Sequence, residues 1–164
     1  MKLTYLKLDT SNLSEEYFSK LVKLENSTNA DPYFAEQLKE IITQKSNSTF
    51  VCFDDEKIIG MLTANQSSKK FGGSIYVINL SVDKDYQRKG IATQLFIEAS
   101  QYYENININE IMSLEVDKTN NKAIGLYKKL GFNLVEDYND EEQYGMTISL
   151  EELNKHLKNT NKIN

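Results

Sequence analysis

Apolar residues recur along the chain with two periods, one typical of strands and one typical of helices. Residues 3–8 largely alternate between apolar and polar side chains, which predicts a first strand. Ser14 is followed by two glutamates that suit the positive end of a helix dipole, and apolar residues then recur at helical spacing, so a helix is expected there. Asp31 followed by Pro32 predicts the start of a second helix, which runs to about residue 45.

Strands dominate the middle of the chain. Apolar runs at 50–53 and 57–64 flank a polar turn and predict a hairpin. Residues 74–82 are apolar at nearly every position, so we expect a strand with both faces buried. The elements expected after it are a helix over 90–104, a strand over 111–116, a helix over 120–130, a hairpin of 132–137 with 143–150, and a short last helix.

The order of these elements, β-α-α-β-β-β-α-β-α-β-β, defines the fold class. Strands with helices between them are typical of an α/β domain whose mixed sheet is covered by helices on both faces. A chain of 164 residues has room for one hydrophobic core. We find no internal repeat and no linker, so a single domain is expected.

Composition excludes several classes of function. A net charge of −5 argues against a protein that coats nucleic acid or anionic lipid. One cysteine and one histidine leave no disulfide framework and no cysteine-rich or multi-histidine metal site, so no metal is expected. No apolar run is long enough to span a membrane, and the first residues lack the pattern of a signal peptide. A cytoplasmic protein is therefore expected.

The single arginine lies between the strongest strand and the next helix. In the segment 80–92 a strand ends, a polar turn follows and a helix begins at Gly90. Unpaired N–H groups and the dipole at a helix start attract phosphates, glycine allows close approach, and Arg88 and Lys89 add positive charge. The glycine patterns of the P-loop and of the dinucleotide fold are absent. The segment is either a pyrophosphate site or an ordinary strand–turn–helix with a solvated basic turn.

A second strand-to-helix segment carries polar side chains at helical spacing. Asn120 and Tyr127 are seven residues apart and so share a helix face, with the small Ala123 between them. Glu115 lies near the end of the preceding strand, where open α/β sheets bind ligands.

Together the two segments resemble the GNAT superfamily of acetyl-CoA-dependent N-acetyltransferases. Residues 87–92, Gln-Arg-Lys-Gly-Ile-Ala, look like the family's acyl-CoA loop, and 120–132 looks like its Asn-x-x-Ala-x-x-x-Tyr-x-x-x-Gly-Phe helix. The resemblance implies a mixed, mostly antiparallel sheet of six to seven strands with helices on both faces. It implies an acetyltransferase domain over 1–150 and leaves 151–164 as a short C-terminal helix and tail.

Two branches of the family are similar in their motifs. Glu115 with Asn120 and the run 126–132 resembles the ribosomal-protein alanine N-acetyltransferases, in which the matching Glu and Tyr are the proposed base and acid. The stretch 49–93 resembles the type I aminoglycoside 3-N-acetyltransferases. In that branch the strand carries an acid where this chain has Asn79, which cannot act as a base.

The resemblance implies transfer of an acetyl group from acetyl-CoA to a primary amine by direct attack in a ternary complex. Glu115 or a water molecule is the expected base that deprotonates the amine, and Tyr127 is the expected acid for the leaving thiolate. A backbone N–H near Leu80 is expected to stabilise the oxyanion, and Asn79 is expected to contact the substrate or a relaying water. The residues expected to bind acetyl-CoA are Leu80, Ser81, Val82, Gln87, Arg88, Lys89, Gly90, Ile91, Ala92, Thr93 and Asn120.

Alternatives to these roles stay open. Glu115 is otherwise a strand-end carboxylate satisfied by backbone donors, and Tyr127 is otherwise an aromatic residue packed on the inner face of its helix. For the whole protein, the alternative is a catalytically inactive acyl-CoA-binding sensor or interaction domain of the same fold. The amine substrate is either a small molecule or a protein N-terminus.

Three features lie outside the two motifs. Cys52 is expected in the core, and His156 is expected either to face solvent or to be a contact residue. The acidic residues of 136–142 form either a solvated hairpin loop or a surface that attracts a cationic amine. The last helix carries a narrow stripe of leucines at 150, 153 and 157 and is marginal alone, so either the domain's own surface or a second copy must hold it. We expect a homodimer in which this helix contributes contacts.

Overall fold

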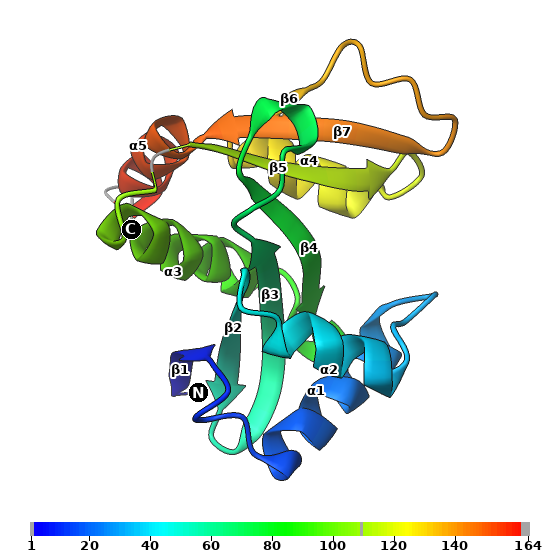
Figure 1. The fold of residues 1–164 in the computed structure, drawn as a ribbon, viewed down its shortest axis with the longest axis vertical. Coiled ribbons are helices and arrows are strands. Elements are labelled where there is room, and N and C mark those ends of the chain that lie inside the picture. Colours follow the sequence, from blue (N-terminus) through cyan, green and yellow to red (C-terminus); the bar gives the residue numbers. More distant parts are fainter. Residues whose placement is uncertain (1, 109, 162–164) are drawn as a thin grey trace. The chain divides into compact units, whose positions relative to one another are not determined.

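Seven strands and five α-helices make up the part of the chain that the computed structural model describes, residues 2–108 and 110–161 (Figure 1). The strands are β1 (Leu3–Leu8), β2 (Asn47–Asp54), β3 (Lys57–Asn65), β4 (Ile75–Val82), β5 (Ile111–Asp117), β6 (Asn133–Leu134) and β7 (Gln143–Ser149). The helices are α1 (Glu15–Thr28), α2 (Ala35–Thr43), α3 (Ile91–Asn105), α4 (Asn121–Lys129) and α5 (Leu150–Asn161), with short 3₁₀ helices η1 (Lys70–Gly72) and η2 (Lys84–Tyr86).

The strands form one mixed sheet in the order β1-β2-β3-β4-β5-β7-β6. The pairs β1–β2, β2–β3, β5–β7 and β6–β7 are antiparallel. The pair β4–β5 is parallel, with Ile75 opposite Met112 and Tyr76 opposite Ser113. The predicted fold class, a mixed and mostly antiparallel sheet in an α/β chain, is confirmed.

The contacts divide the chain into two compact units. One holds the described residues of 1–65 and 78–99, and the other holds those of 66–77 and 100–164. Strand β4 and helix α3 therefore each contribute residues to both units.

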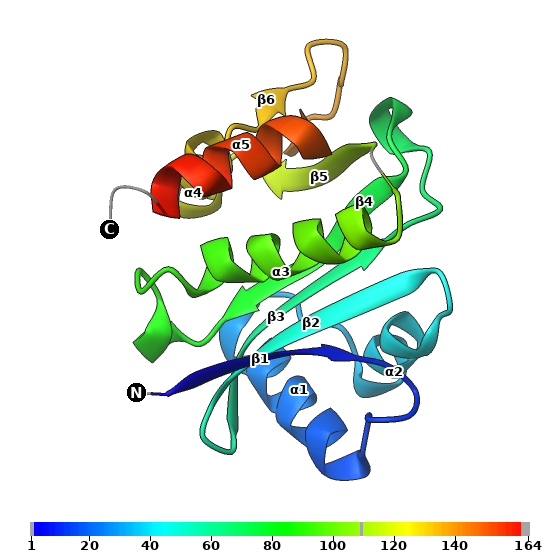
Figure 2. The ribbon, with the colours of Figure 1, turned by 90° about the vertical axis from the view of Figure 1, so that its left-hand side faces the viewer.

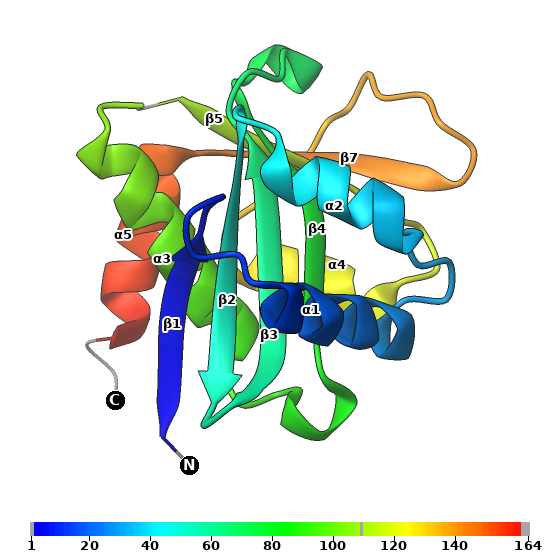
Figure 3. The ribbon, with the colours of Figure 1, turned by 60° about the horizontal axis from the view of Figure 1, so that its bottom comes forward.

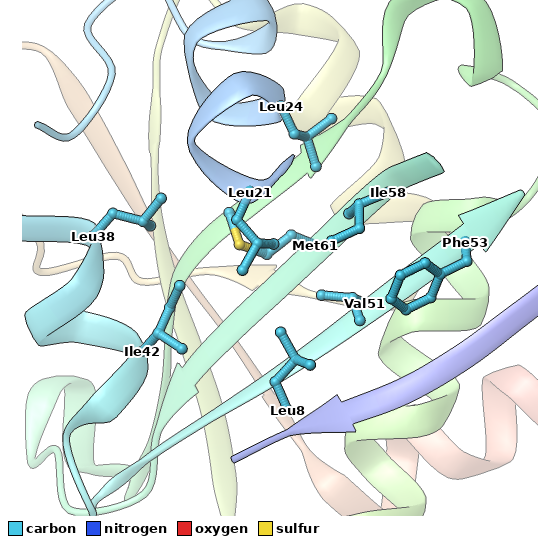
Figure 4. Close-up of a cluster of buried hydrophobic side chains, with 9 residues drawn as sticks. All are labelled: Leu8, Leu21, Leu24, Leu38, Ile42, Val51, Phe53, Ile58 and Met61. Carbon is cyan, nitrogen blue, oxygen red and sulfur yellow. The ribbon is translucent and has the colours of Figure 1, made fainter. Parts of the chain in front are cut away.

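In the first unit, helices cover both faces of β2 and β3. Figure 3 shows α1 and α2 lying across one face, where Leu21 and Leu38 pack with Val51 and Met61 in the cluster of Figure 4. Gly60, the neighbour of Met61, points to the opposite face because side chains alternate along a strand. A Cβ there would lie 2.9 Å from Ile91 Cγ2, so α3 packs directly on the glycine.

Helix α1 begins as its sequence predicts, whereas α2 does not. Ser14 caps α1 by accepting the Tyr17 N–H at 3.1 Å. The predicted cap at Asp31 is wrong, because α2 begins at Ala35 after Phe34. The side chain of Gln37 accepts the Phe34 N–H at 3.0 Å and so provides the hydrogen bond that caps the helix. The cap therefore lies at Phe34, three residues after the predicted position at Asp31.

The second unit carries α4 and α5. Helix α4 ends in a Schellman motif at Gly131 (φ 97°), as predicted, with the Phe132 N–H donating to the Tyr127 carbonyl at 3.0 Å. In α5, the leucines at 150, 153 and 157 are at most 4% exposed, so the chain itself buries the predicted apolar stripe. Figure 2 shows α5 beside α4, where the His156 ring approaches Gly131. The homodimer stays a prediction, as does the domain boundary at residue 150.

Candidate functional site

The turn after β4 is held by hydrogen bonds at its first residue. The Asp83 N–H donates to the Ile59 carbonyl at 2.8 Å, and the Asp83 carboxylate accepts the Asp85 N–H at 3.0 Å. Lys57 forms an ion pair with Asp83 at 2.8 Å, and this hydrogen-bonded partner lowers the pKa of the Asp83 carboxyl despite partial burial. These contacts fix the turn at the point where it leaves β4.

The backbone at 88–90 has the geometry of an anion-binding loop. Arg88 and Gly90 both have positive φ, 61° and 79°, on either side of Lys89. Alternation of handedness in a short loop turns successive N–H groups toward one concave side, and α3 then begins at Ile91 with N–H groups that no helical carbonyl reaches. A Cβ at Gly90 would meet nothing within 4 Å, so the space beside the glycine is open. This arrangement fits a pyrophosphate.

The polar and charged side chains of this loop are exposed. Gln87, Arg88 and Lys89 are all exposed. Gln87 donates from Nε2 to the Val82 carbonyl at 3.1 Å, and Lys89 donates from Nζ to the Asp85 carbonyl at 2.9 Å. The loop therefore combines an anchored backbone with positive charge at the start of α3.

The second half of strand β4, residues 78–82, buries its polar side chains and leaves its apolar ones half-buried, whereas Ile75 and Val77 in the first half are buried. Asn79 and Ser81 are 8% and 2% exposed, whereas Ile78, Leu80 and Val82 are of intermediate exposure. The prediction that both faces of this strand are buried is therefore wrong. The half-buried row is suited to an acyl chain, and it includes two of the residues predicted to line acetyl-CoA.

The buried side of β4 faces a carboxylate that the sequence analysis did not single out. Glu25 on α1 is 1% exposed and accepts from Asn79 Nδ2 at 2.7 Å and from the Tyr33 N–H at 3.4 Å. Ser81 Oγ lies 3.3 Å from the same carboxylate and accepts from Asn29 Nδ2 at 3.2 Å. Helical spacing could have found Glu25, because it follows Leu21 by four residues on the buried face of α1.

In the second unit, Glu115 on β5 lies among three hydrogen-bond donors. Tyr76 Oη donates to its Oε1 at 2.9 Å and Tyr138 Oη donates to its Oε2 at 2.6 Å. Lys70 forms an ion pair with Oε1. Partial burial alone would raise the pKa of the Glu115 carboxyl, but bonds from Lys70 and the two tyrosines outweigh it and lower the pKa. The carboxylate is therefore satisfied by side chains rather than by backbone donors.

Tyr127 lies on α4, as predicted, and Asn120 is the residue that caps the start of this helix. Tyr127 is 7% exposed, its ring centroid lies 5.8 Å from that of Phe132, and burial raises the pKa of its phenol to about 12. Asn120 caps the helix by accepting the Ala123 N–H at 3.1 Å. The phenol therefore stays protonated, and able to donate, across the neutral range.

The predicted site residues fall into two groups. Asn79, Leu80, Ser81, Val82 and the loop 87–93 lie together in the first unit. Glu115, Asn120 and Tyr127 lie in the second.

Residues outside the motifs behave largely as predicted. Cys52 is fully buried and burial raises its thiol pKa, which confirms it as a core residue. His156 is exposed. In the acidic loop, Asp140 accepts the N–H groups of Glu142 and Gln143, both at 2.8 Å, and so builds the turn. Over the described residues, no helix is long and apolar enough to cross a membrane. The cytoplasmic location stays a prediction.

The family model for the acetyltransferase (GNAT) family matches residues 11–132. This chain belongs to that family, which confirms the predicted resemblance and the predicted class of enzyme, an acyltransferase. The expected acetyl-CoA cosubstrate agrees with this membership.

Relatives and solved structures are similar over most of the chain. N-alpha-acetyltransferase 30 of Schizosaccharomyces pombe is 27% identical over 121 residues, 73% of this chain and 79% of that protein. The ribosomal-protein-S18-alanine N-acetyltransferase of Escherichia coli has the same fold, with a TM-score of 0.74, 21% identity, and coverage of 91% of this chain and 94% of that chain. Arabidopsis thaliana NAA60 in complex with acetyl-CoA has a TM-score of 0.73 at 20% identity, covering 92% and 99%.

Proposed function

We propose that this acetyltransferase moves the acetyl group of acetyl-CoA onto a primary amine, and that the amine is the N-terminus of a protein or peptide. The observation that supports acetyl-CoA as the acetyl donor is the loop at Arg88 and Gly90. Its positive φ angles and open space suit a pyrophosphate at the start of α3. The likeness to N-alpha-acetyltransferase 30, which covers most of both chains, supports the α-amine as acceptor.

Acetyl-CoA binds, in this proposal, with its pyrophosphate at Gln87–Ala92, with Thr93 as a further contact, and with its pantetheine arm along Leu80–Val82. The half-buried apolar side chains of Leu80 and Val82 support the second contact, because the methylene groups of an extended pantetheine arm bury apolar surface there. Ser81 supports it through its backbone, since its hydroxyl is committed to the buried side. Asn120 fixes the start of α4 and so contributes to the site through the helix that carries Tyr127.

The reaction is a direct attack of the amine nitrogen on the thioester carbon. Glu115, or a water molecule, first takes one proton from the ammonium group, and the neutral amine then forms the C–N bond. The C–S bond breaks as Tyr127 supplies a proton to the departing thiolate, and the second proton lost by the nitrogen restores the Tyr127 hydroxyl. A backbone N–H near Leu80 stabilises the oxyanion in between. Glu115 starts the reaction ionised and Tyr127 starts it protonated, which are the forms that a base and an acid require. The lowered pKa of Glu115 also makes the carboxylate a weaker base, and the raised pKa of Tyr127 makes the phenol a weaker acid.

Release of CoA in the presence of a panel of amines tests the proposal. The panel contains short peptides with free N-termini, the same peptides with blocked N-termini, a polyamine and an aminoglycoside. Release with the free peptides alone supports the proposed acceptor, and release with the polyamine or the aminoglycoside replaces it by a small-molecule amine. Binding of acetyl-CoA without release on any amine would favour an inactive acyl-CoA-binding domain.

A further inference from the structure

The candidate base Glu115 already holds an ammonium group, that of Lys70. Lys70 lies on η1, far from Glu115 in sequence, and pairs with its Oε1. The Glu115 side chain is 13% exposed and the Lys70 side chain is 54% exposed. Lys70 therefore lies on the solvent side of the carboxylate.

The groups around Glu115 suit a primary ammonium ion. The Lys70 Nζ lies 4.7 Å from the centre of the Tyr76 ring, within the range of a cation–π contact. Both neighbouring phenols, Tyr76 and Tyr138, point their hydroxyl groups at the carboxylate and so fix its orientation. A carboxylate with an aromatic face beside it attracts a cation and offers it a hydrogen-bond acceptor.

The chain bends sharply to bring Lys70 to this place. Phe71, the next residue, has a left-handed φ of 55°, which is unfavourable for a non-glycine residue. Its ring packs edge-on against Tyr138, with centroids 4.9 Å apart. A Cβ at Gly145 on β7 would lie 2.8 Å from Phe71 Cζ, so the glycine makes room for this ring. The contacts of Phe71 hold the bend, and the bend directs Lys70 to Glu115.

We propose that Glu115, Tyr76 and Tyr138 form the receptor for the ammonium group of the substrate, and that Lys70 is an internal occupant which the substrate displaces. The inference rests on the proposed function, because it takes the acceptor to be a primary amine. A substrate ammonium group that replaces Lys70 meets the same carboxylate and the same aromatic face. Lys70 then competes with the substrate and weakens its apparent binding in proportion to the time it occupies the receptor.

Steady-state kinetics with Lys70→Met test the competition. Methionine keeps the unbranched apolar stem and removes the ammonium group. The KM for the peptide amine should fall about two- to fivefold, the range expected for a half-exposed ion pair, while the KM for acetyl-CoA stays the same. The matched control is Lys69→Met, which removes the same charge from the neighbouring, exposed lysine. An equal fall in Lys69→Met, or a rise in KM in Lys70→Met, would overturn the proposal.

A binding experiment separates this inference from the proposed function. Calorimetry measures the affinity of n-butylammonium chloride for the wild type and both variants, without acetyl-CoA and at constant ionic strength. Binding that is about two- to fivefold tighter in Lys70→Met alone supports the receptor, even if no variant releases CoA on any amine and the proposed function fails. Affinity that is equal in the wild type and Lys70→Met, including undetectable binding in both, overturns the receptor.

Discussion

The side-chain amide of Asn79 on β4 donates to Glu25 on α1 at 2.7 Å, and both side chains are buried. The two residues are 54 positions apart, so this bond joins a helix to the strand that carries the predicted donor site. Removal of the carboxylate leaves a buried amide donor without its acceptor, which is more costly than loss of an exposed bond.

Glu25→Ala should therefore lower the free energy of unfolding by about 1–3 kcal/mol. Chemical denaturation followed by circular dichroism measures the change. Glu16→Ala on the same helix is the control, because its carboxylate is 73% exposed and pairs with Lys20 four residues on. Equal effects of the two substitutions would contradict a structural role for the buried bond.

Gly90→Asp should abolish measurable binding of acetyl-CoA. Gly90 has a φ of 79°, which strains any L-residue, and its open side is where the proposal places the pyrophosphate. An aspartate there adds bulk and negative charge. Gly72→Asp is the matched control, since Gly72 has a φ of 74° and equally open surroundings outside the loop. Calorimetry that finds undiminished affinity in Gly90→Asp would move the site elsewhere.

Tyr127→Phe should lower kcat about a hundredfold or more and change the KM for acetyl-CoA far less, since the lost proton donor acts in the transition state. The phenol pKa of about 12 means that the wild type keeps this donor protonated throughout the assay range. Any fall in rate between pH 8 and pH 10 then has another origin. Tyr144→Phe, at an exposed tyrosine on β7, controls for a general effect of losing a hydroxyl. Equal rates for wild type and Tyr127→Phe would remove the acid role.

The free energy of unfolding should decline as the pH falls below 4.5, the ordinary pKa of a glutamate. The pKa of Glu115 is lowered in the folded state, so its contribution is present above the unfolded value of 4.5 and is lost as the pH falls through the folded value. Denaturant midpoints between pH 7 and pH 3 should show a smaller decline in Glu115→Gln than in the wild type. The exposed Glu141→Gln should leave the wild-type decline unchanged. Identical pH dependence in all three proteins would refute the stabilising contacts.

Leu153→Ala should destabilise the protein by about 2–5 kcal/mol, because Leu153 on α5 is fully buried. The exposed Lys155→Ala on the same helix should cost little, since its ion pair with Glu151 is solvated. Thermal unfolding compares the two.

Light scattering on the same samples, and on a chain truncated after Leu150, checks the predicted homodimer. A monomeric mass for the full-length chain at tens of micromolar would end that prediction.

Local signals explain what the sequence predicted well. Ser14 and Gly131 each cap a helix through hydrogen bonds to residues within five positions, and the local sequence is enough to predict such bonds. The helix start after Gly90 was predicted for the same reason, because the residues that form it are neighbours in the sequence. The error at Asp31 arose because α2 begins after Phe34, a residue that carries no N-cap signal of its own and whose N–H is accepted by the Gln37 side chain.

Distant contacts explain what the sequence could not predict. The burial of Asn79 and Ser81 involves Glu25, more than 50 residues earlier, and the pattern of β4 alone does not reveal this partner. The same pattern predicted burial for the face of Ile78, Leu80 and Val82, which is only half-buried. Glu115 was found from its place on a strand, but its partner Lys70 is 45 residues away in a polar loop. The sheet brings such residues together from distant parts of the chain. No periodicity along the sequence links them, and local patterns therefore cannot predict these contacts.

For protein engineering, β4 reverses a common rule of thumb. A solubility screen would first replace its half-buried row, Ile78, Leu80 and Val82, by polar residues and would leave Asn79 and Ser81 as natural surface positions. Residues 78–82 are arranged the other way round, with the side chains of Asn79 and Ser81 buried and hydrogen-bonded to Glu25 on α1. Redesign that keeps residues 78–82 intact, and places added charges on the exposed faces of α1 and α5 instead, spares both the buried bonds to Glu25 and the residues proposed to line acetyl-CoA.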